Sequence, residues 1–235
     1  MPAAGVSRIA VIIPAHNEEQ FLPACLASLE AAATRTELPV RVVVAVDRCT
    51  DTTAELARSF GATTVTALAP GVGSARAAGC AAALADGPEG LWLATTDADS
   101  TVPIDWFGRQ LAHARRGADV VIGTVAVEDW SEYPAHVPAR YLDGYQFSSG
   151  HRHIHGANLG FRADCYLAIG GFTPVSADED VELIGRFERA GHQLVWAGDL
   201  AVTTSARRIG RAPRGFASFL SALAEPVSTD WEAAG

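Results

Sequence analysis

The sequence contains no lysine, so all 18 of its basic residues are arginine. This absence argues against two classes of site, because a Walker-type phosphate loop and a Schiff-base enzyme both depend on the lysine amine. An anion bound by this chain must therefore be held by arginine, by backbone N–H groups or by a metal ion.

Cysteines are few, and long apolar runs are absent. The four cysteines show no C-x-x-C spacing, which argues against a zinc or redox motif and favours reduced, intracellular thiols. The N-terminus has no apolar signal core, and no stretch reaches the ~18 to 20 apolar residues that span a bilayer. We therefore expect a soluble, cytoplasmic protein with no transmembrane segment.

Net charge and size narrow the protein class further. The net charge of −9 is spread along the chain without basic runs, which argues against a nucleic-acid partner. With 235 residues and 49% hydrophobic content, the chain is long enough for one domain with a substantial core. Composition leaves the oligomeric state open, a homodimer included.

The pattern of elements predicts an α/β fold. Short β-branched runs alternate with helical patterns, as in βαβ units with a largely parallel sheet. Strands are expected at residues 9–13, 40–46, 63–68, 91–96 and 119–125. Helices are expected at 21–29, from a Thr52-x-x-Glu55 capping box to Gly61, in the Ala-rich stretch before the fourth strand, from near Pro103 to Gly117, and from about Val181 to Ala190. The last 20 or so residues are expected to be partly disordered.

Acidic side chains follow the first two predicted strands. The segment PAHNEE, residues 14–19, comes directly after the first strand, and Asp47 ends the second. Because parallel strands place ligands at their carboxyl ends, these residues are candidates for one binding crevice. The alternative is that Asn17 and the glutamates cap a helix, and that Asp51 caps the next one.

A glycine-rich segment, PGVGSARAAG, follows the third predicted strand. A dinucleotide-binding fingerprint belongs after the first strand, so this position argues against a Rossmann oxidoreductase. Arg76 in this segment either reaches a phosphate from a helix start or is solvated on the helix surface. The sequence favours neither hypothesis.

Asp97 and Asp99 end the fourth strand in the stretch LWLATTDADS. In an extended chain they share one face and lie roughly 6.6 Å apart along it, close enough to serve one shell of metal, ribose and diphosphate. An Asp-rich turn is the competing interpretation. Their position in line with the other strand ends favours a binding site.

Seven motifs together resemble the family-two glycosyltransferases. They are VIIPAHNEE, VDRCTDTT, GSARAAG, TTDADS, GANLGFR, AIGGF and DEDVELIGRFERAGHQL, in family order and spacing over roughly residues 8–207. The resemblance implies a GT-A fold, a Rossmann-like, mostly parallel sheet flanked by helices. It implies a single domain with a nucleotide-sugar-binding half at about 8–125, an acceptor-binding and catalytic half at about 126–210, and a C-terminal tail or helix at 211–235.

The resemblance also implies roles for individual residues. It implies a nucleotide-sugar donor, a divalent cation (Mn²⁺ or Mg²⁺), and an inverting transfer to a hydroxyl-bearing acceptor that is a small molecule or lipid-linked. The implied contacts are Pro14, Ala15 and Glu18 with the nucleotide, Asp47 with the base, Arg76 on the nucleotide side, Asp97 with ribose or metal, Asp99 as principal metal ligand, Glu179 beside the substrate, and Asp180 as catalytic base.

The chain departs from the family pattern at three places. Val46 replaces a common Asp, and Ala77 replaces a common Asn, so the nucleotide is not identified. VTTSARR stands where many members supply a metal-binding His, which leaves the third metal ligand open. His151, His153 and His155 in HRHIH share a face if extended; they form a polar loop face, or His153 or His155 supplies that ligand.

Two other functions compete with the glycosyltransferase. A sugar-phosphate nucleotidyltransferase also uses an α/β sheet and paired Asp residues, but the lysines expected to handle its phosphates are absent. A non-catalytic nucleotide-sugar-binding protein would account for the missing His. Acidic residues 178–180 fit either a catalytic base or a simple helix cap.

Overall fold

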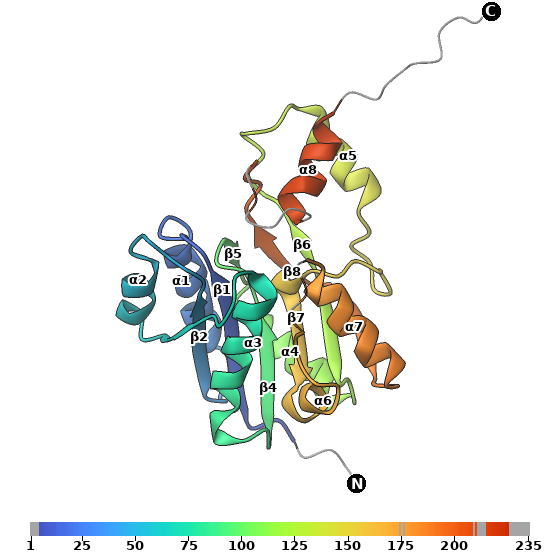
Figure 1. The fold of residues 1–235 in the computed structure, drawn as a ribbon. Coiled ribbons are helices and arrows are strands. Elements are labelled where there is room, and N and C mark those ends of the chain that lie inside the picture. The colour runs from blue at the N-terminus through green and yellow to red at the C-terminus, as the bar shows by residue number, and fades with distance from the viewer. Residues whose placement is uncertain (1–4, 174, 176, 209, 211–214, 226–235) are drawn as a thin grey trace, which may run out of the picture.

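The computed structural model describes residues 5–173, 175, 177–208, 210 and 215–225. Within this part of the chain, eight strands form one sheet in the order β3-β2-β1-β4-β7-β6-β8-β5. Helices cover both faces of the sheet, and α5 and α8 lie together beyond its end (Figure 1). The α/β class and the GT-A layout expected from the sequence are confirmed.

The first half of the chain forms the parallel part of the sheet. Each crossover carries a helix, as the alternating pattern predicts. The strands are β1 (Arg8–Ala15), β2 (Val40–Val46), β3 (Thr63–Thr66) and β4 (Leu91–Thr95). The helices are α1 (Leu22–Ala33), α2 (Thr53–Ser59) and α3 (Val72–Ala83), the last followed by the short helix η1 (Leu84–Asp86).

The second half adds strands of both directions. β7 runs antiparallel to β4 and to β6, β8 runs parallel to β6, and β5 runs antiparallel to β8. The strands are β5 (Ser100–Thr101), β6 (Val120–Ala126), β7 (Leu159–Arg162) and β8 (Leu194–Thr204). The helices are α4 (Trp106–Arg115), α5 (His136–Gly144), η2 (Gly156–Asn158), α6 (Ala163–Ala168), α7 (Glu179–Arg189) and α8 (Phe216–Ala224).

Two apolar layers hold the helices to the sheet. On one face, α1 and α4 bury Leu26 and Trp106 against the strands. On the other face, α3, α6 and α7 bury Cys80, Tyr166 and Phe187. Burial of such large apolar side chains contributes roughly 1.5–3 kcal/mol each, so both faces of the sheet are stabilised by packing.

One local expectation is wrong, and the structure gives the exact starts of two expected helices. The Thr52 side chain does not cap α2, because its hydroxyl donates to Glu19 Oε2 at 2.7 Å instead. The helix expected from Pro103 begins at Trp106, after the turn closed by the Trp106 N–H on the Pro103 carbonyl. The helix expected from Val181 begins two residues earlier, at Glu179, so that residue is part of a helix.

The four cysteines form no disulfide in the structure. Within the described residues, no helix is long and apolar enough to cross a membrane. Part of the expected C-terminal tail forms α8, which packs on α5 through a hydrogen bond from Arg140 to the Leu223 carbonyl at 2.8 Å. The remainder of that prediction, residues 211–214 and 226–235, lies outside the described residues.

Candidate active site

The carboxyl ends of β1, β2 and β4 meet at one edge of the sheet, where they border a first cavity of about 310 Å³. Parallel pairing places Ala15 beside Val46, so the residues that follow both strands reach the same edge. The cavity is lined by six residues named from the sequence, which are Pro14, Ala15, Glu18, Asp47, Asp97 and Asp99. The structure therefore brings together these six residues of the predicted donor side, whereas Arg76, also expected there, lines a neighbouring cavity.

Asp47 is a well-partnered carboxylate in the wall of the first cavity. It accepts hydrogen bonds from the backbone N–H of Gly71 and from Nε of Arg48, both at 2.8 Å. Burial works against its charge, but these donors prevail and lower the pKa of Asp47. The neighbouring Asp51 has the expected capping role, since its Oδ1 accepts the Thr53 N–H at 3.1 Å.

Arg76 is buried, so the solvated-surface hypothesis for it is wrong. Its side chain is 3% exposed and forms ion pairs with Asp97, at 2.5 Å, and with Glu179. Burial raises the pKa of Glu179, while Arg76 opposes that shift. Arg76 thus connects the end of β4 to the start of α7, and Glu179 is its buried partner.

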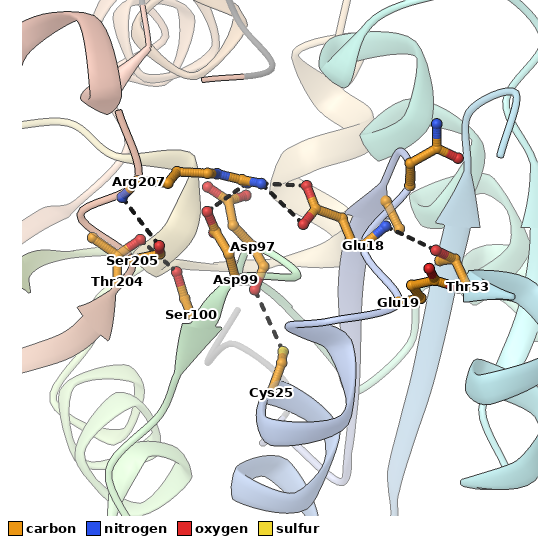
Figure 2. Close-up of polar contacts among 12 residues, drawn as sticks. Glu18, Glu19, Cys25, Thr53, Asp97, Asp99, Ser100, Thr204, Ser205 and Arg207 are labelled. Carbon is orange, nitrogen blue, oxygen red and sulfur yellow. Dashed lines mark hydrogen bonds and ion pairs between the residues drawn. The ribbon is translucent and has the colours of Figure 1, made fainter. Parts of the chain in front are cut away.

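Arg207 lies between Asp99 and Glu18 (Figure 2). Its Nη2 is 2.5 Å from Asp99 Oδ2, and its two terminal nitrogens donate to both carboxylate oxygens of Glu18 at 2.9 and 3.0 Å. Burial raises the pKa of Asp99 to about 6, and Arg207 works against that rise. The sequence does not mark Arg207 as a site residue, although its segment occupies the place of the expected metal-binding His.

A second cavity, of about 380 Å³, adjoins the first and shares five lining residues with it, which are Val72, Asp97, Thr204, Gly215 and Phe216. Asp180 lines this second cavity and accepts the backbone N–H of Gly156 at 2.7 Å. The proposed base therefore lies in a different cavity from Asp99, with Asp97 bordering both.

Two of the three histidines of HRHIH, His153 and His155, pack with Tyr145, whereas the His151 ring contacts His153 and Trp196. The rings of His153 and Tyr145 stack with centroids 4.0 Å apart, and His155 Nε2 lies 2.8 Å from the Tyr145 hydroxyl. Burial lowers the pKa of His155 to about 3, so this imidazole is neutral. His151 is fully buried, so a solvated polar loop face is wrong for it.

The histidines do not supply the ligand expected beside Asp99. His153 and His155 line the second cavity, and their Nε2 atoms are engaged by the Gln146 N–H and the Tyr145 hydroxyl. At Asp99 itself the structure places the guanidinium of Arg207. The chain segment after β8 therefore contributes a cation at this position.

A separate group of potential metal ligands consists of Asp119, Cys165 and His192. Asp119 Oδ2 already lies 3.0 Å from the Gln193 N–H and 3.3 Å from His192 Nδ1. Burial raises the pKa of Cys165 to about 12, which keeps the thiol protonated, whereas metal coordination needs the thiolate. This group is satisfied by its own contacts.

The donor chemistry of Asp97 and Asp99 fits Mg²⁺ or Mn²⁺. Both ions prefer carboxylate oxygens, and both side chains border the first cavity from positions two residues apart after β4. Each carboxylate also forms an ion pair with an arginine, Asp97 with Arg76 and Asp99 with Arg207. The residues fit a divalent cation by type, and a cation at Asp99 has to share that carboxylate with Arg207 or displace it.

Known proteins resemble this chain in sequence and in fold. It is 35% identical over 115 residues to an uncharacterized glycosyltransferase of Mycobacterium tuberculosis (strain ATCC 25618 / H37Rv), covering 49% of this chain and 47% of that protein. It is 34% identical over 116 residues to the dolichyl-phosphate hexose transferase of Haloferax volcanii, covering 49% and 46%. The chain thus spans about half the length of the curated relatives it matches.

A solved structure with the same fold is the mannosyltransferase PcManGT from Pyrobaculum calidifontis in complex with GDP-Man and Mn²⁺. It superimposes with a TM-score of 0.62 at 18% identity, over 92% of this chain and 69% of that one. The sequence profile described as "Glycosyl transferase family 2" matches residues 10–169, more than half of the sequence. The chain therefore belongs to glycosyl transferase family 2.

Proposed function

We propose that this protein transfers a sugar from a nucleoside diphosphate donor in the first cavity to an acceptor in the second. The observation that carries the proposal is the meeting of the two cavities at Asp97, with Asp99 on the donor side and Asp180 on the acceptor side. Transfer requires donor and acceptor to meet at the anomeric carbon, and adjoining cavities supply that geometry.

The donor side holds the nucleotide and its diphosphate. Pro14, Ala15 and Asp47 line the part of the first cavity assigned to the nucleoside, and Asp47 offers carboxylate acceptors to the N–H groups of a base. Asp99, with Asp97, would hold a divalent cation, which when bound offsets charge on the leaving diphosphate. The Mn²⁺ ion bound with GDP-Man in the PcManGT complex supports this assignment.

The acceptor side holds the proposed general base, Asp180. As an acceptor hydroxyl attacks, it loses a proton, and the Asp180 carboxylate at the second cavity accepts it. This role belongs to an inverting transfer, in which the acceptor attacks opposite the leaving diphosphate. Asp180 Oδ1 accepts the Val181 N–H in the first turn of α7 at 2.8 Å, as in the helix-cap alternative, but Oδ2 accepts the N–H of Gly156, a residue outside α7. A simple helix cap does not account for this second contact.

Apolar side chains border the second cavity. Val181 and Phe219 line it and are 49% and 45% exposed, so an apolar portion of an acceptor would bury them. The name of one relative, the dolichyl-phosphate hexose transferase, contains a lipid phosphate, which supports a lipid-linked acceptor. A small hydroxyl compound is the other candidate class.

The test uses UDP- and GDP-sugars with Mn²⁺ or Mg²⁺, and measures nucleoside diphosphate release with each acceptor class. We expect release that needs the cation, stops in EDTA, and is stimulated by one acceptor class. Asp99→Asn should lose the cation-dependent part of nucleoside diphosphate binding, because a neutral amide is a poor ligand for Mn²⁺ or Mg²⁺. Undiminished binding in that variant, or in wild type with EDTA, would contradict the cation's role.

The same assay separates the competing functions. A nucleotidyltransferase would form a nucleotide sugar from a nucleoside triphosphate and a sugar phosphate, and would release pyrophosphate. A binding protein would retain the donor without turnover, even with acceptor and cation present. Membership of the glycosyl transferase family favours sugar transfer over nucleotidyl transfer and over binding without turnover.

A further inference from the structure

Arg207 occupies the position at Asp99 that the proposed function gives to a divalent cation. Its guanidinium contacts Asp99 through Nη2 at 2.5 Å and holds Glu18 with both terminal nitrogens, as Figure 2 shows. All three side chains are largely buried, with exposed fractions of 18% for Arg207, 10% for Asp99 and 4% for Glu18. Such charge-assisted pairs, shielded from water, are stronger than surface ion pairs.

Strand pairing brings Arg207 to this position. The register of β5 with β8 pairs Ser100 with Thr204, and the Ser205 N–H donates to the Asp99 carbonyl at 3.1 Å. Arg207 follows two residues later, with its own N–H on Ser205 Oγ at 3.2 Å. The backbone that carries Asp99 is thus tied to the backbone that leads to Arg207, so their contact is a property of the fold.

The charges of the site explain why a cation is needed there. Four carboxylates, those of Glu18, Asp97, Asp99 and Glu179, are paired with two guanidinium groups. Arg76 serves Asp97 and Glu179, whereas Arg207 serves Asp99 and Glu18. If Arg207 moved away, the largely buried carboxylates of Glu18 and Asp99 would lose the positive charge of its guanidinium. This loss is unfavourable unless another cation takes the place of the guanidinium.

We propose that Arg207 and a divalent cation compete for Asp99, and that the donor's diphosphate accepts the displaced guanidinium. The proposal rests on the proposed function. Coordination of Asp99 would place a divalent charge beside the arginine, and the two positive charges repel each other at that separation. A diphosphate resolves the conflict, because it gives the guanidinium an anionic partner of matching geometry.

The competition has a thermodynamic consequence. Without nucleotide, the cation must displace Arg207 and so binds weakly. With a nucleoside diphosphate present, Arg207 has a new partner and the cation binds more tightly. Because binding free energies are linked, the cation increases nucleotide affinity by the same factor.

The test measures Mn²⁺ affinity directly, by the loss of the free-ion electron paramagnetic resonance signal, in protein without nucleotide. Arg207→Gln removes the competing charge, and we expect its Mn²⁺ dissociation constant to fall by at least about tenfold, within the usual range of coupling between sites. Arg207→Lys keeps a charge but not the two-pronged contact, so its affinity should lie between the two. Arg208→Gln alters the next, exposed arginine, which lies over Tyr133, and should match wild type.

Thermal melts establish that each variant is folded. If Arg207→Gln does not fold, the comparison of Arg207→Lys with wild type still decides. A second readout needs no variant: in wild type, adding UDP or GDP should tighten Mn²⁺ binding by more than the ion's affinity for the free nucleotide explains. Tighter Mn²⁺ binding in both Arg207 variants supports the proposal, and unchanged or weaker binding in them overturns it.

The outcomes separate this inference from the proposed function. If wild type binds Mn²⁺ with nucleotide and transfers sugar, while the Arg207 variants show wild-type affinity for Mn²⁺ alone, the inference fails and the function stands. If the Arg207 variants gain Mn²⁺ affinity but wild type transfers no sugar to either acceptor class, the inference stands and the function fails. If no form binds Mn²⁺ with or without nucleotide, both fail.

Discussion

Asp180 accepts a hydrogen bond from the backbone N–H of Gly156, with Oδ2 and N 2.7 Å apart. Gly156 also borders Arg76 so closely that a Cβ at this position would overlap the guanidinium. One glycine thus contacts both the candidate base on the acceptor side and the arginine that pairs with Asp97. The two sides of the site are positioned by the same short segment before β7.

The first prediction concerns the role of Asp180 as base. Asp180→Asn keeps the side chain's shape and an oxygen for the Gly156 N–H, so donor and cation binding should be nearly unchanged. Turnover should fall by ~10² to 10⁴, the usual contribution of a general base. Steady-state kinetics with a donor-binding assay checks this. Asp178→Asn, at the residue just before α7, is the matched control and should keep most of the activity.

Two results would reject the base assignment. One is turnover in Asp180→Asn comparable to that of wild type. The other is a product that retains the donor's anomeric configuration, because a retaining enzyme has no need of a base at this position.

The second prediction concerns the burial of Arg76. Arg76→Met leaves Glu179 in a buried position without its cation, and a broken buried ion pair costs about 3–5 kcal/mol. We expect a loss of that order in the free energy of unfolding, measured by chemical denaturation. Arg58→Met, which breaks a pair with Glu55 at 3.9 Å on the exposed face of α2, should cost less than about 1 kcal/mol. Equal costs would contradict the structural role of Arg76.

The third prediction concerns the missing Cβ at Gly156. Gly156→Ala forces the Arg76 guanidinium or the backbone to move, and overpacking of this kind costs about 1–3 kcal/mol. Differential scanning calorimetry should show a lower midpoint temperature. Gly108→Ala is the opposite control, since this exposed glycine inside α4 has open space around its Cβ position and alanine there favours the helix by roughly 0.5–1 kcal/mol. A midpoint temperature for Gly156→Ala at or above that of wild type would rule out the close contact.

The fourth prediction concerns pH and His155. Burial lowers the pKa of this imidazole to about 3, below the ordinary 6.5, so between these values the unfolded chain binds a proton that the folded protein does not. Stability therefore falls as pH drops from about 6.5 towards 3, with a slope from this group of up to about 1.4 kcal/mol per pH unit. Urea unfolding at pH 7, 6, 5 and 4 measures the slope.

The matched variants for that experiment are His155→Gln and His136→Gln. Replacing His155 removes the titrating group, so the loss of stability on acidification should become shallower. His136 is exposed at the start of α5, and its replacement should leave the wild-type slope. An unchanged slope in His155→Gln would contradict the buried, neutral state of the imidazole.

Much of the fold was accessible from the sequence. The strand predicted at 40–46 agrees with β2, and the strand predicted at 91–96 ends within one residue of β4. Short β-branched runs predict these strands well because the same apolar residues that form the local pattern are buried in the sheet. The predicted Thr52 capping box is wrong because the Thr52 hydroxyl bonds instead to Glu19, 33 residues away in the sequence. No local sequence pattern reveals a partner at that distance.

The candidate site was predictable in part. Asp47, Asp97 and Asp99 border one cavity as expected, because residues that follow neighbouring parallel strands meet at one edge of the sheet. The sequence does not decide whether Arg76 contacts a phosphate or is solvated, because a helix of small residues does not show which of its faces is covered. Packing of α3 against β1 and α7 settled that it is buried.

By itself, the sequence determined which chemistry this protein has to use. Because the chain has no lysine, its anion-binding groups are arginines and backbone N–H groups. The local apolar pattern sets where each strand ends, and several carboxylates follow directly after those ends. Only the tertiary structure decided which arginine serves which carboxylate. Arg207 reaches Asp99 because β8 pairs with β5 across about a hundred residues of chain, and Coulomb attraction depends on distance in space, not along the sequence.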